Sequence, residues 1–462
     1  MAANQYDFAI IGSGVSGGRV AYELTRGGAK CVLLEAGKRF EARDFPKPEI
    51  DYSSQLFWGG GIEFNHDGRL GLLRAKCVGG TSIVNQALLD EFDDLAWEDW
   101  IARSGARFLN AAEMKPHYDA ILAEVPVSEV PPAYFNRNTK IFVEGFERKS
   151  LRWSPLHRAQ KDCRLDQGTD CICCLGGCPR ESKQSSAVTT IRWAEKNGMR
   201  VEPDFEVMEL DATKDGVRVI GRQAGSPIEV RAGKAVLAAG SLGNTAILFR
   251  SGFGSRLPAL GTRFACHPQF MTYGLFSDHV DAHKGAFQAV KSDDPKLRRM
   301  GVKFENVFAP PIATAMLFSG MGRRHFEKMR KYRHYASIEV AVRDEPSGVI
   351  RLDKNGKLAI RKSLTAQDRR RAREGLDVVR EILLAAGALA IEPCAQGFGL
   401  HLMGGCPIGT DAKESVVNPD FQLHGLPNVY AADSSVFPSA PGINPSFTIM
   451  ALSRHAAQGM LR

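Results

Sequence analysis

The chain has 462 residues, of which 44% are hydrophobic, and it carries a formal net charge of +8. This length predicts two or three domains with substantial cores. No apolar run is long enough to span a membrane, which excludes a transmembrane segment. Basic residues gather in two runs, at 323–334 and 369–373, without a nucleic-acid-binding motif, so we expect exposed basic surface and no nucleic-acid partner.

The N-terminal segment is typical of a strand–turn–helix unit that binds a dinucleotide. An apolar strand beginning at about residue 6 leads into three glycines in the pattern G-x-G-x-x-G, namely Gly12, Gly14 and Gly17. In order, they permit a tight turn, close approach of a pyrophosphate, and close packing of helix on strand. The next strand ends at Glu35, the acid expected to bind a ribose hydroxyl, with Ala36 beside it. This motif alone does not distinguish FAD from NAD.

The position of the first strand also bears on localisation. It begins so close to the N-terminus that we expect no signal peptide, and no twin-arginine pair precedes it. We therefore expect a cytoplasmic protein, while export in complex with a signal-bearing partner stays open.

The middle of the chain alternates helical and strand patterns. A second glycine turn lies at 79–82, and residues 91–165 are helical at first and then irregular. We expect a helix at 186–198, paired strands at 199–213, and a strand, glycine turn and helix at 234–252.

A hairpin and a long helix follow. The strand pattern at 336–342 precedes a hairpin at 349–361, whose turn contains Asn355 and Gly356, a strong hairpin signal. A helix then begins after a Thr365 cap and ends near Gly387.

The C-terminal sixty residues contain the strongest functional signal. His401 precedes a pair of glycines, and Asn444-Pro445 opens an apolar run that predicts a helix over 446–458. Asn444 is a good helix N-cap, and Pro445 suits the first helical position. The free N–H groups and partial positive charge of this helix end would stabilise an anionic reduced flavin.

Taken together, these segments resemble the glucose–methanol–choline (GMC) family of flavin oxidoreductases over nearly the whole chain. The resemblance implies an α/β fold in which a Rossmann-like FAD-binding domain is interleaved with an α+β substrate domain built on an antiparallel sheet. The FAD-binding domain would comprise 1–90, 180–266 and 396–462. The substrate domain would comprise 91–179 and 267–395, with a cysteine-rich loop at 163–178.

The resemblance also implies roles for individual residues. His401 matches the active-site histidine of the family, and Asn444 matches the second active-site position, as in the cholesterol-oxidase and long-chain-alcohol branches. Further positions match family contacts to FAD: Gly80, Ser82 and Asn85 along the flavin, Val207 at the adenine, Asp433 near the ribityl chain and pyrophosphate, and the turn and helix starts at Gly240 and Pro445.

The chemistry of the two active-site residues can be argued directly. A neutral histidine can remove the hydroxyl proton of an alcohol near pH 7 while a hydride leaves the carbon. Asn444 can donate a hydrogen bond to the same oxygen without changing the net charge. The other histidines singled out in the sequence, His267, His424 and His455, are expected to be structural.

The cysteine cluster is a second candidate site. Cys171, Cys173, Cys174 and Cys178 fall within eight residues, with Cys163 just upstream. In a reducing compartment this density argues against disulfides, and the spacing does not suit a mononuclear zinc site. Some GMC sugar dehydrogenases look similar here, with a spacing that differs by about a residue, and hold an iron–sulfur cluster. The alternatives are therefore a 3Fe–4S or 4Fe–4S cluster and a structural cysteine-rich turn.

Several functions remain compatible with the sequence. The first is an FAD-dependent dehydrogenase that oxidises an alcohol, sugar or sterol and passes electrons to a protein or quinone acceptor. This reading would involve a small accessory subunit and a cytochrome. The alternatives are an oxygen-using alcohol or sterol oxidase, a lyase or photodecarboxylase of the same fold, and an electron-relay subunit of a complex.

Overall fold

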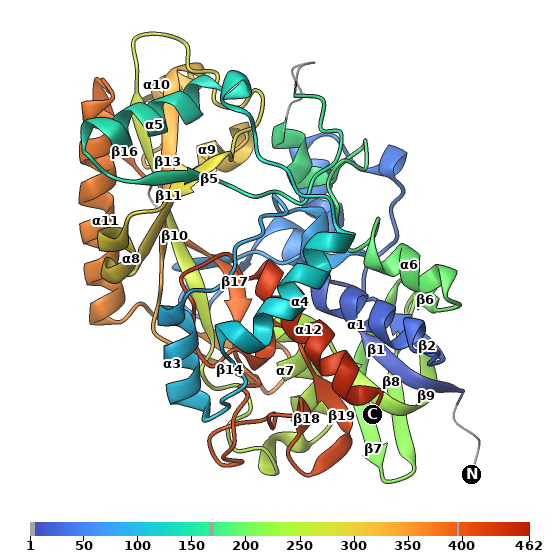
Figure 1. Ribbon diagram of the computed structural model, residues 1–462. Helices are drawn as coiled ribbons and strands as arrows, with labels where there is room; N and C mark the ends of the chain where they lie inside the picture. The colour runs from blue at the N-terminus through green and yellow to red at the C-terminus, as the bar shows by residue number, and fades with distance from the viewer. Residues whose placement is uncertain (1–4, 166–170, 395–396) are drawn as a thin grey trace.

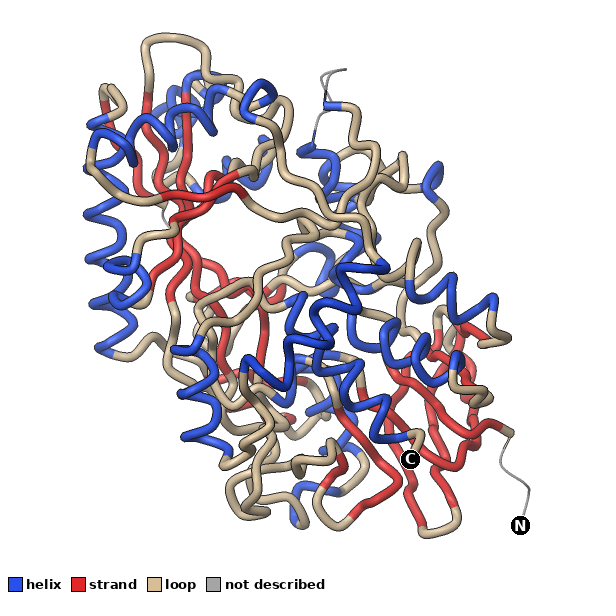
Figure 2. The backbone as a smooth tube through the Cα atoms, viewed as in Figure 1, coloured by secondary structure: helices blue, strands red, loops and turns tan. Residues whose placement is uncertain are grey.

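The structure is a computed structural model that describes residues 5–165, 171–394 and 397–462. It has two lobes, each built around one large sheet (Figure 1). In Figure 2 the strands gather in two groups, with helices beside both groups and also in the region between them. The protein therefore has the mixed α/β architecture expected from its sequence.

The first sheet has a parallel centre, and eight of its strands lie in the described residues. Its order is β18-β19-β9-β1-β2-β6, and an antiparallel extension runs from β9 through β8 to β7. The strands are β1 (Tyr6–Ile11), β2 (Cys31–Leu34), β6 (Arg200–Glu202), β7 (Phe205–Thr213), β8 (Gly216–Gln223), β9 (Ser226–Leu237), β18 (Gln422–Leu423) and β19 (Leu426–Ala431). The pairs β1–β2, β1–β9 and β9–β19 are parallel, as in a doubly wound dinucleotide fold.

Helices from distant parts of the chain cover this sheet. The set is α1 (Val15–Arg26), α4 (Ala111–Glu124), α6 (Thr190–Lys196), α7 (Gly240–Arg250) and α12 (Ser446–Met460). The first and the last of these helices, α1 and α12, pack against each other (Figure 1). The apolar strands and the inner faces of these helices form one continuous core.

The second sheet is mostly antiparallel, and nine of its strands lie in the described residues. Its order is β3-β4-β17-β10-β13-β12-β11-β5, with β16 also paired to β10. The strands are β3 (Glu63–Phe64), β4 (Leu70–Leu72), β5 (Trp153–Pro155), β10 (Ala265–Leu275), β11 (Val290–Ser292), β12 (Val302–Asn306), β13 (Tyr335–Val342), β16 (Ala390–Pro393) and β17 (Gly397–Met403). This sheet therefore includes β3, β4 and β17, which come from segments that the sequence analysis grouped with the cofactor domain.

The long helix of the second lobe forms as the sequence predicts. α11 (Ala366–Ala385) begins with a capping box between Thr365 and Asp368. Its buried positions recur every three or four residues and face β10 and β13, alongside α5 (Arg137–Arg148). The hairpin β14 (Val349–Leu352) and β15 (Leu358–Arg361) also lies where its turn motif predicts it.

The remaining helices are shorter and lie mostly at the surface. They are α2 (Glu49–Leu56), α3 (Asp94–Ser104), α8 (Pro295–Met300), α9 (Pro311–Leu317) and α10 (Gly322–Met329). None of the helices in the described part of the chain is both long and apolar enough to cross a bilayer.

Three local expectations need correction. The strands at 199–213 do not pair with each other, because β6 joins β2 and β7 joins β8. The helix expected at 186–198 is only α6, and the residues before it form turns that bond to the glycine loops. The C-terminal helix continues to Met460 instead of ending at 458.

Candidate active site

The glycine loop after β1 forms a cradle at the N-terminus of α1. A Cβ on Gly17 would lie 1.9 Å from the carbonyl oxygen of Gly12, and a Cβ on Gly12 would lie 2.4 Å from that of Ala238, so both positions require glycine. Gly14 differs, because a Cβ there would meet none of the described atoms within 4 Å. The first N–H groups of α1 have no side-chain cap and face this open space, which suits the pyrophosphate of a dinucleotide.

Glu35 lies at the end of β2 and is tied to the same loop. Its carboxylate accepts hydrogen bonds from Ser13 N at 3.0 Å, Ser13 Oγ at 2.6 Å and Gly37 N at 2.8 Å. Burial raises the pKa of Glu35, and these donors oppose that shift. Ala36 follows and is half-buried. Oε2 already accepts both bonds from Ser13, while Oε1 accepts only the bond from Gly37 and keeps a lone pair that a ribose hydroxyl could use.

The second glycine turn abuts the first. A Cβ on Gly80 would lie 2.9 Å from Cα of Gly14, so the two loops touch. Ser82 is occupied by its own chain, since its hydroxyl donates to Gly79 O at 2.5 Å and lies 3.0 Å from Ser186 Oγ. Asn85 lines the large cavity described below.

The buried ammonium group of Lys183 holds this second turn in place. It donates to the carbonyl oxygens of Ile83 at 2.5 Å, Asn85 at 2.7 Å and Cys174 at 2.7 Å. The 80–85 turn is therefore held by a cation that also binds the carbonyl oxygen of Cys174 in the cysteine-rich loop.

The remaining predicted cofactor contacts lie around the same sheet edge. Asp433 accepts hydrogen bonds from Gly240 N at 2.6 Å and from Nδ2 of Asn244, which anchors the start of α7. Burial raises the pKa of Asp433. Val207 is buried on β7, two residues after Phe205, whose N–H donates to the carbonyl of Glu35. Val207 thus lies on the strand that adjoins Glu35.

A cavity of about 550 Å³ lies between the lobes. Its walls come from α2, α9, the 84–88 loop and the strands β10, β12, β13 and β17. Most of the lining is apolar. Its polar side chains include a group formed by Gln269, Gln288, Glu305, Glu339, His401 and Asn444. The cavity therefore has an apolar body and a concentrated set of proton donors and acceptors, as binding pockets for small molecules commonly do.

His401 reaches the cavity through a β-bulge. The β10–β17 ladder pairs Ala265 with Met403 and His267 with Leu400. Between these two pairs β10 has one residue and β17 has two, so β17 contains one extra residue. The extra residue places His401 in the left-handed region, with φ of 55°. For a residue with a Cβ this conformation costs about 1 kcal/mol. Bulges of this kind re-aim a side chain, and here the imidazole is directed at the cavity.

A second histidine lies directly behind His401. Nδ1 of His267 is 2.9 Å from Nδ1 of His401, and the two rings are nearly perpendicular, at 82°. The backbone N–H of Gly442 donates to Nε2 of His267 at 3.0 Å. Burial, with the neighbouring His401 as the next cause, lowers the pKa of His267 well below its usual value. Burial and the positive charge of Lys303 lower the pKa of His401 to about 3. Both imidazoles are therefore neutral near pH 7.

Asn444 contacts a buried charge network. Its Nδ2 donates to Glu305 at 2.9 Å, and Glu305 also accepts from Gln288 and pairs with Lys303 at 2.6 Å. Lys303 in turn pairs with Asp90 at 2.7 Å. Burial opposes the ionisation of Asp90, but Lys303 and Lys291 lower its pKa below the usual range. Burial also opposes the charge of Lys303, yet Asp90 and Glu305 raise its pKa.

The expected N-cap role of Asn444 is wrong. The N-cap of α12 is Pro445, which has no side-chain acceptor, and the first helical residue is Ser446. Asn444 does not cap because its amide is turned towards Glu305. The first N–H groups of α12 consequently have no side-chain cap, and Ser446 lines the cavity. This leaves the positive end of a fifteen-residue helix available to an anionic group.

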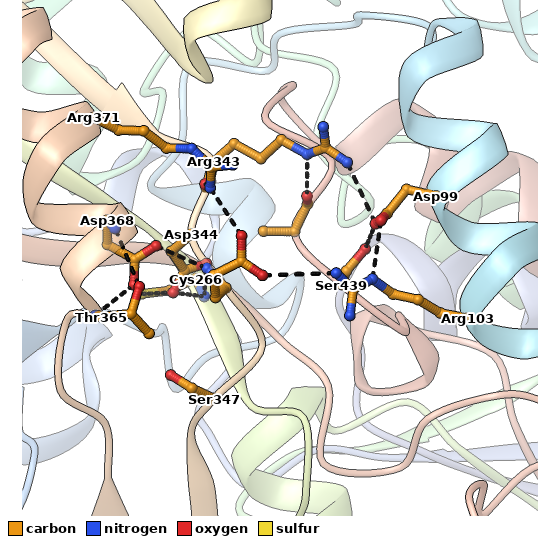
Figure 3. Close-up of polar contacts among 12 residues, drawn as sticks. Asp99, Arg103, Cys266, Arg343, Asp344, Ser347, Thr365, Asp368, Arg371 and Ser439 are labelled. Atoms are coloured by element: carbon orange, nitrogen blue, oxygen red, sulfur yellow. Dashed lines mark hydrogen bonds and ion pairs between the residues drawn. The ribbon is translucent and has the colours of Figure 1, made fainter.

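A polar network supports Cys266, which precedes His267, and the loop that follows Ser439; Figure 3 shows its members Cys266, Asp344, Arg343, Asp99 and Ser439. The N–H of Cys266 donates to Asp344 at 3.2 Å, and Nε of Arg343 donates to the carbonyl of Ala440 at 3.2 Å. Arg343 also pairs with Asp99 at 3.3 Å, and the hydroxyl of Ser439 donates to Asp99. The network joins the start of β10, which includes His267, to the loop that contains Gly442. The N–H of Gly442 in that loop donates to His267.

The residues that could hold a dinucleotide and those that could act on a substrate thus meet between two sheets. The arrangement can be compared with known proteins. Family models described as GMC oxidoreductase match residues 53–269 and residues 344–453.

The chain belongs to the GMC oxidoreductase family. An uncharacterised GMC-type oxidoreductase of Mycobacterium tuberculosis is 27% identical, with 97% of this chain and 74% of the relative covered. A long-chain-alcohol oxidase of Arabidopsis thaliana is 24% identical, with 96% and 65% covered. A cholesterol oxidase of M. tuberculosis is 24% identical, with 98% and 90% covered. As a GMC oxidoreductase the chain is an FAD-dependent enzyme.

Solved structures show the same fold. Pyridoxine 4-oxidase from Mesorbium loti superposes with a TM-score of 0.77 at 17% identity, covering 98% of this chain and 99% of that one. Formate oxidase from Aspergillus oryzae superposes with a TM-score of 0.73 at 14% identity, covering 100% and 98%.

FAD can be tested against the residues of this GMC oxidoreductase. A Cβ on Gly14 would project into open space. Glycine at this position therefore leaves room for a ligand to approach the backbone closely. The side-chain amide of Gln86 is buried beside Asn85, and neither its oxygen nor its nitrogen has a partner among the described atoms. A buried amide without partners is costly, and polar edges of a bound group would satisfy it. These observations fit a bound flavin dinucleotide.

The structure brings some of the sequence-predicted residues of this GMC oxidoreductase together and adds others. His401 and Asn444, predicted as a pair, both line one cavity. His267, expected to be structural, lies behind His401 and contacts its ring. Glu305 and Glu339 were not singled out at all. No local motif marks these three, and only the strand register shows that they face the site.

The cysteine cluster stays a prediction. The side chains of Cys171 and Cys173 lie outside the described residues. Cys174 is buried and Cys178 is half-buried, and their side chains contact each other. The contact with Cys174, followed by burial, raises the pKa of Cys178. Within the residues that the structure describes, no three ligating side chains gather closely enough to hold a metal ion.

Proposed function

We propose that this GMC oxidoreductase oxidises the CH–OH group of an apolar alcohol with FAD as the hydride acceptor. The observation that supports this most is the union of His401 and Asn444 at the polar end of one apolar cavity. A hydroxyl placed there would lie against hydrogen-bonding groups, while the rest of the molecule would occupy apolar surroundings.

The chain offers a separate set of residues to hold the cofactor. The cradle at Gly14 and the N-terminus of α1 would hold the pyrophosphate, and Glu35 the ribose. The 80–85 turn and the uncapped N-terminus of α12 would lie along the flavin. When bound, FAD supplies the two-electron acceptor that alcohol oxidation requires.

The polar end of the cavity supplies the groups for the hydroxyl. His401 is neutral at pH 7 and is therefore either a hydrogen-bond donor or a proton acceptor. The amide of Asn444 can orient the oxygen, and its own geometry is fixed by Glu305. Two groups could take the hydroxyl proton, the imidazole of His401 and the carboxylate of Glu305, and both line the cavity.

The apolar walls favour a long aliphatic alcohol or a sterol over a sugar. Ile62, Leu73, Phe308, Met316 and Leu317 are among the lining residues. A sugar exposes a hydroxyl on almost every carbon, and burying these against apolar side chains would leave them unpaired. The relatives named a long-chain-alcohol oxidase and a cholesterol oxidase agree with this choice.

For the electron acceptor we propose molecular oxygen. The sequence alone favoured a protein or quinone acceptor and left open whether the cysteines hold an iron–sulfur cluster. The named relatives and solved structures are oxidases, which supports oxygen instead. Consumption of oxygen with formation of hydrogen peroxide would support this choice, and turnover only with a quinone would contradict it.

Anaerobic reduction of the bound flavin tests the proposal. The purified holoenzyme is mixed with 1-decanol, cholesterol or glucose in the absence of oxygen, and the visible flavin absorbance is followed. We expect the apolar alcohols to bleach the flavin and glucose to leave it oxidised. His401→Ala should keep its FAD and be reduced at least about 100-fold more slowly. Failure of every alcohol to bleach the parent flavin would contradict the proposed function.

A further inference from the structure

We propose that His267 is a positioning residue that fixes the tautomer of His401, so that His401 presents an N–H group to the cavity. The inference rests on the proposed function for its catalytic meaning, while its structural content stands on the contacts of His267 alone. Those contacts form a chain of three groups that leads from the backbone of Gly442 through His267 to His401.

The first link has only one possible direction. A backbone N–H is always a donor, so Nε2 of His267 must be the acceptor in the 3.0 Å bond from Gly442. A nitrogen that accepts a hydrogen bond carries no hydrogen. Because the imidazole of His267 is neutral, its single N–H must be on Nδ1.

The second link follows from the first. Nδ1 of His267 is 2.9 Å from Nδ1 of His401, so one of them must donate and the other must accept. His267 has its hydrogen there, and Nδ1 of His401 is therefore the acceptor. The neutral ring of His401 has one hydrogen, and because Nδ1 accepts a hydrogen bond, that hydrogen is on Nε2.

The surroundings prevent the opposite arrangement. If His401 carried its hydrogen on Nδ1, His267 would carry its own on Nε2, against the N–H of Gly442. Two donors facing each other at 3.0 Å would leave two buried N–H groups without an acceptor. The loop cannot easily withdraw, because Nη1 of Arg298 donates to the carbonyl of Gly442 and Nε of Arg343 donates to the carbonyl of Ala440.

Charged groups around the pair do not supply a competing proton. Only 2% of the surface of His267 is exposed. Besides His401, the ionisable groups that act on its ring are Lys303, Arg298 and Arg343. All three are cations and oppose protonation of the ring. His401 is influenced by Lys303 and by Asp90, with the effect of Lys303 the larger. The pair therefore stays neutral, which is the condition that the tautomer argument needs.

With its hydrogen on Nε2, His401 is a hydrogen-bond donor to the substrate hydroxyl and not the base that removes its proton. An Nε2 that already carries hydrogen can donate to the oxygen, but it cannot take up its proton. As the hydride leaves the carbon with both bonding electrons, the hydroxyl proton passes instead to a carboxylate oxygen of Glu305, which becomes a carboxylic acid. His401 then stabilises the negative charge that develops on the oxygen, as a preorganised donor does.

Nuclear magnetic resonance of the holoenzyme tests the tautomer directly. The protein is labelled with 15N-histidine, and the ring nitrogens of His401 and His267 are assigned by the disappearance of their signals in His401→Ala and His267→Gln. We expect hydrogen on Nε2 of His401 and on Nδ1 of His267. Hydrogen on Nδ1 of His401 would overturn the proposal. The measurement needs no turnover, so it stays decisive even if no alcohol reduces the flavin.

Two matched variants test the consequence for the reaction. The amide of His267→Gln can accept from Gly442 and donate to His401, so it preserves the direction of both bonds. The carboxylate of His267→Glu can only accept, so it draws a hydrogen onto Nδ1 of His401. For His267→Gln we expect kcat within about 10-fold of the parent value. For His267→Glu we expect kcat to fall by at least about 100-fold while KM stays nearly unchanged.

The pH profile separates this role from simple packing. In His267→Glu the nearby carboxylate should raise the pKa of His401 towards neutrality and add an inflection to the profile of kcat against pH. Equal losses in the Gln and Glu variants, with no new inflection, would overturn the proposal, because a packing role depends on size and not on hydrogen-bond direction. If the Glu variant does not fold, the tautomer measured in the parent decides.

Discussion

Glu305 and Glu339 lie directly opposite each other on β12 and β13, and both side chains line the cavity beside Asn444. Two carboxylates at such a cross-strand position repel each other, so they do not ionise equally. Glu305 has Lys303, Gln288 and Asn444 as partners. Burial and the adjacent Glu305 raise the pKa of Glu339 well above its usual value. Glu339 is therefore a carboxylic acid near pH 7, while Glu305 pairs with Lys303.

This asymmetry predicts different effects for the same substitution at the two positions. Glu339→Gln replaces a neutral acid by a neutral amide and should change the free energy of unfolding at pH 7 by less than about 1 kcal/mol. Glu305→Gln leaves Lys303 with only one buried carboxylate and should cost about 2 kcal/mol. Urea unfolding of both variants measures the difference. Equal losses would mean that Glu339 is ionised.

The glycine loop offers a pair of substitutions that separates folding from cofactor binding. Gly14 has φ of −62°, which alanine adopts readily, and its added Cβ meets open space. Gly14→Ala should therefore fold with unchanged stability in the absence of FAD and retain much less FAD. The added Cβ of Gly17→Ala would press on the carbonyl of Gly12, and we expect a loss of about 3 kcal/mol.

The two glycine variants are compared by flavin content after purification and by thermal unfolding of the FAD-free proteins. A Gly14→Ala variant that binds FAD as tightly as the parent would contradict the placement of the pyrophosphate at this loop.

Lys183 predicts a link between stability and cofactor affinity. Its ammonium group donates to three backbone carbonyls, two of them in the turn that follows Gly80. Lys183→Met removes these bonds and leaves buried carbonyls without a donor, which should cost about 3 kcal/mol and weaken FAD binding. The exposed neighbour Lys161 provides a control, since Lys161→Met should alter neither property. Normal FAD affinity in Lys183→Met would show that the turn is held by other contacts.

The two neutral histidines predict sensitivity to acid. The pKa values of His267 and His401 lie below that of an unfolded histidine, about 6.5, and that of His401 is about 3. Below pH 6.5 the unfolded chain therefore binds protons that the folded protein excludes, and stability falls as the pH falls. Each group contributes a slope of about 1.4 kcal/mol per pH unit, or about 2 kcal/mol between pH 6.5 and 5.

Urea unfolding at these two pH values measures this slope, and His401→Gln serves as the comparison. The variant should lose less stability on acidification than the parent. An identical slope in both proteins would mean that His401 is not held neutral in the folded state.

The sequence predicted the parts of the fold that depend on local chemistry. The glycine spacing placed β1 and α1, the Asn355-Gly356 turn placed the hairpin, and the Thr365 cap placed α11. Each of these signals arises from backbone conformation or capping within a few residues. Strand partners depend on the whole sheet, which explains why β6 and β7 were expected to pair with each other and instead join different neighbours.

The same distinction applies to the candidate site. His401 and Asn444 stand beside glycine and proline, and that context marks them. His267 is preceded by cysteine and followed by proline at the start of a strand, with nothing local to suggest a role. Its contact with His401 depends on a bulge in β17 and on the position of Gly442, and both are properties of the assembled sheet. The sequence context marked Asn444 as a candidate, while nothing in the sequence marked its partner Glu305.

The packing of α1 against α12 has a consequence for how the enzyme is made. The strand that leads into the first glycine loop is synthesised more than two hundred residues before its neighbour β9, and α12, which packs on α1, is synthesised later still. Long-range parallel pairing of this kind forms slowly. We therefore expect a nascent chain to retain no flavin until α12 has been synthesised, so ribosome-bound fragments that stop before α12 should emerge colourless.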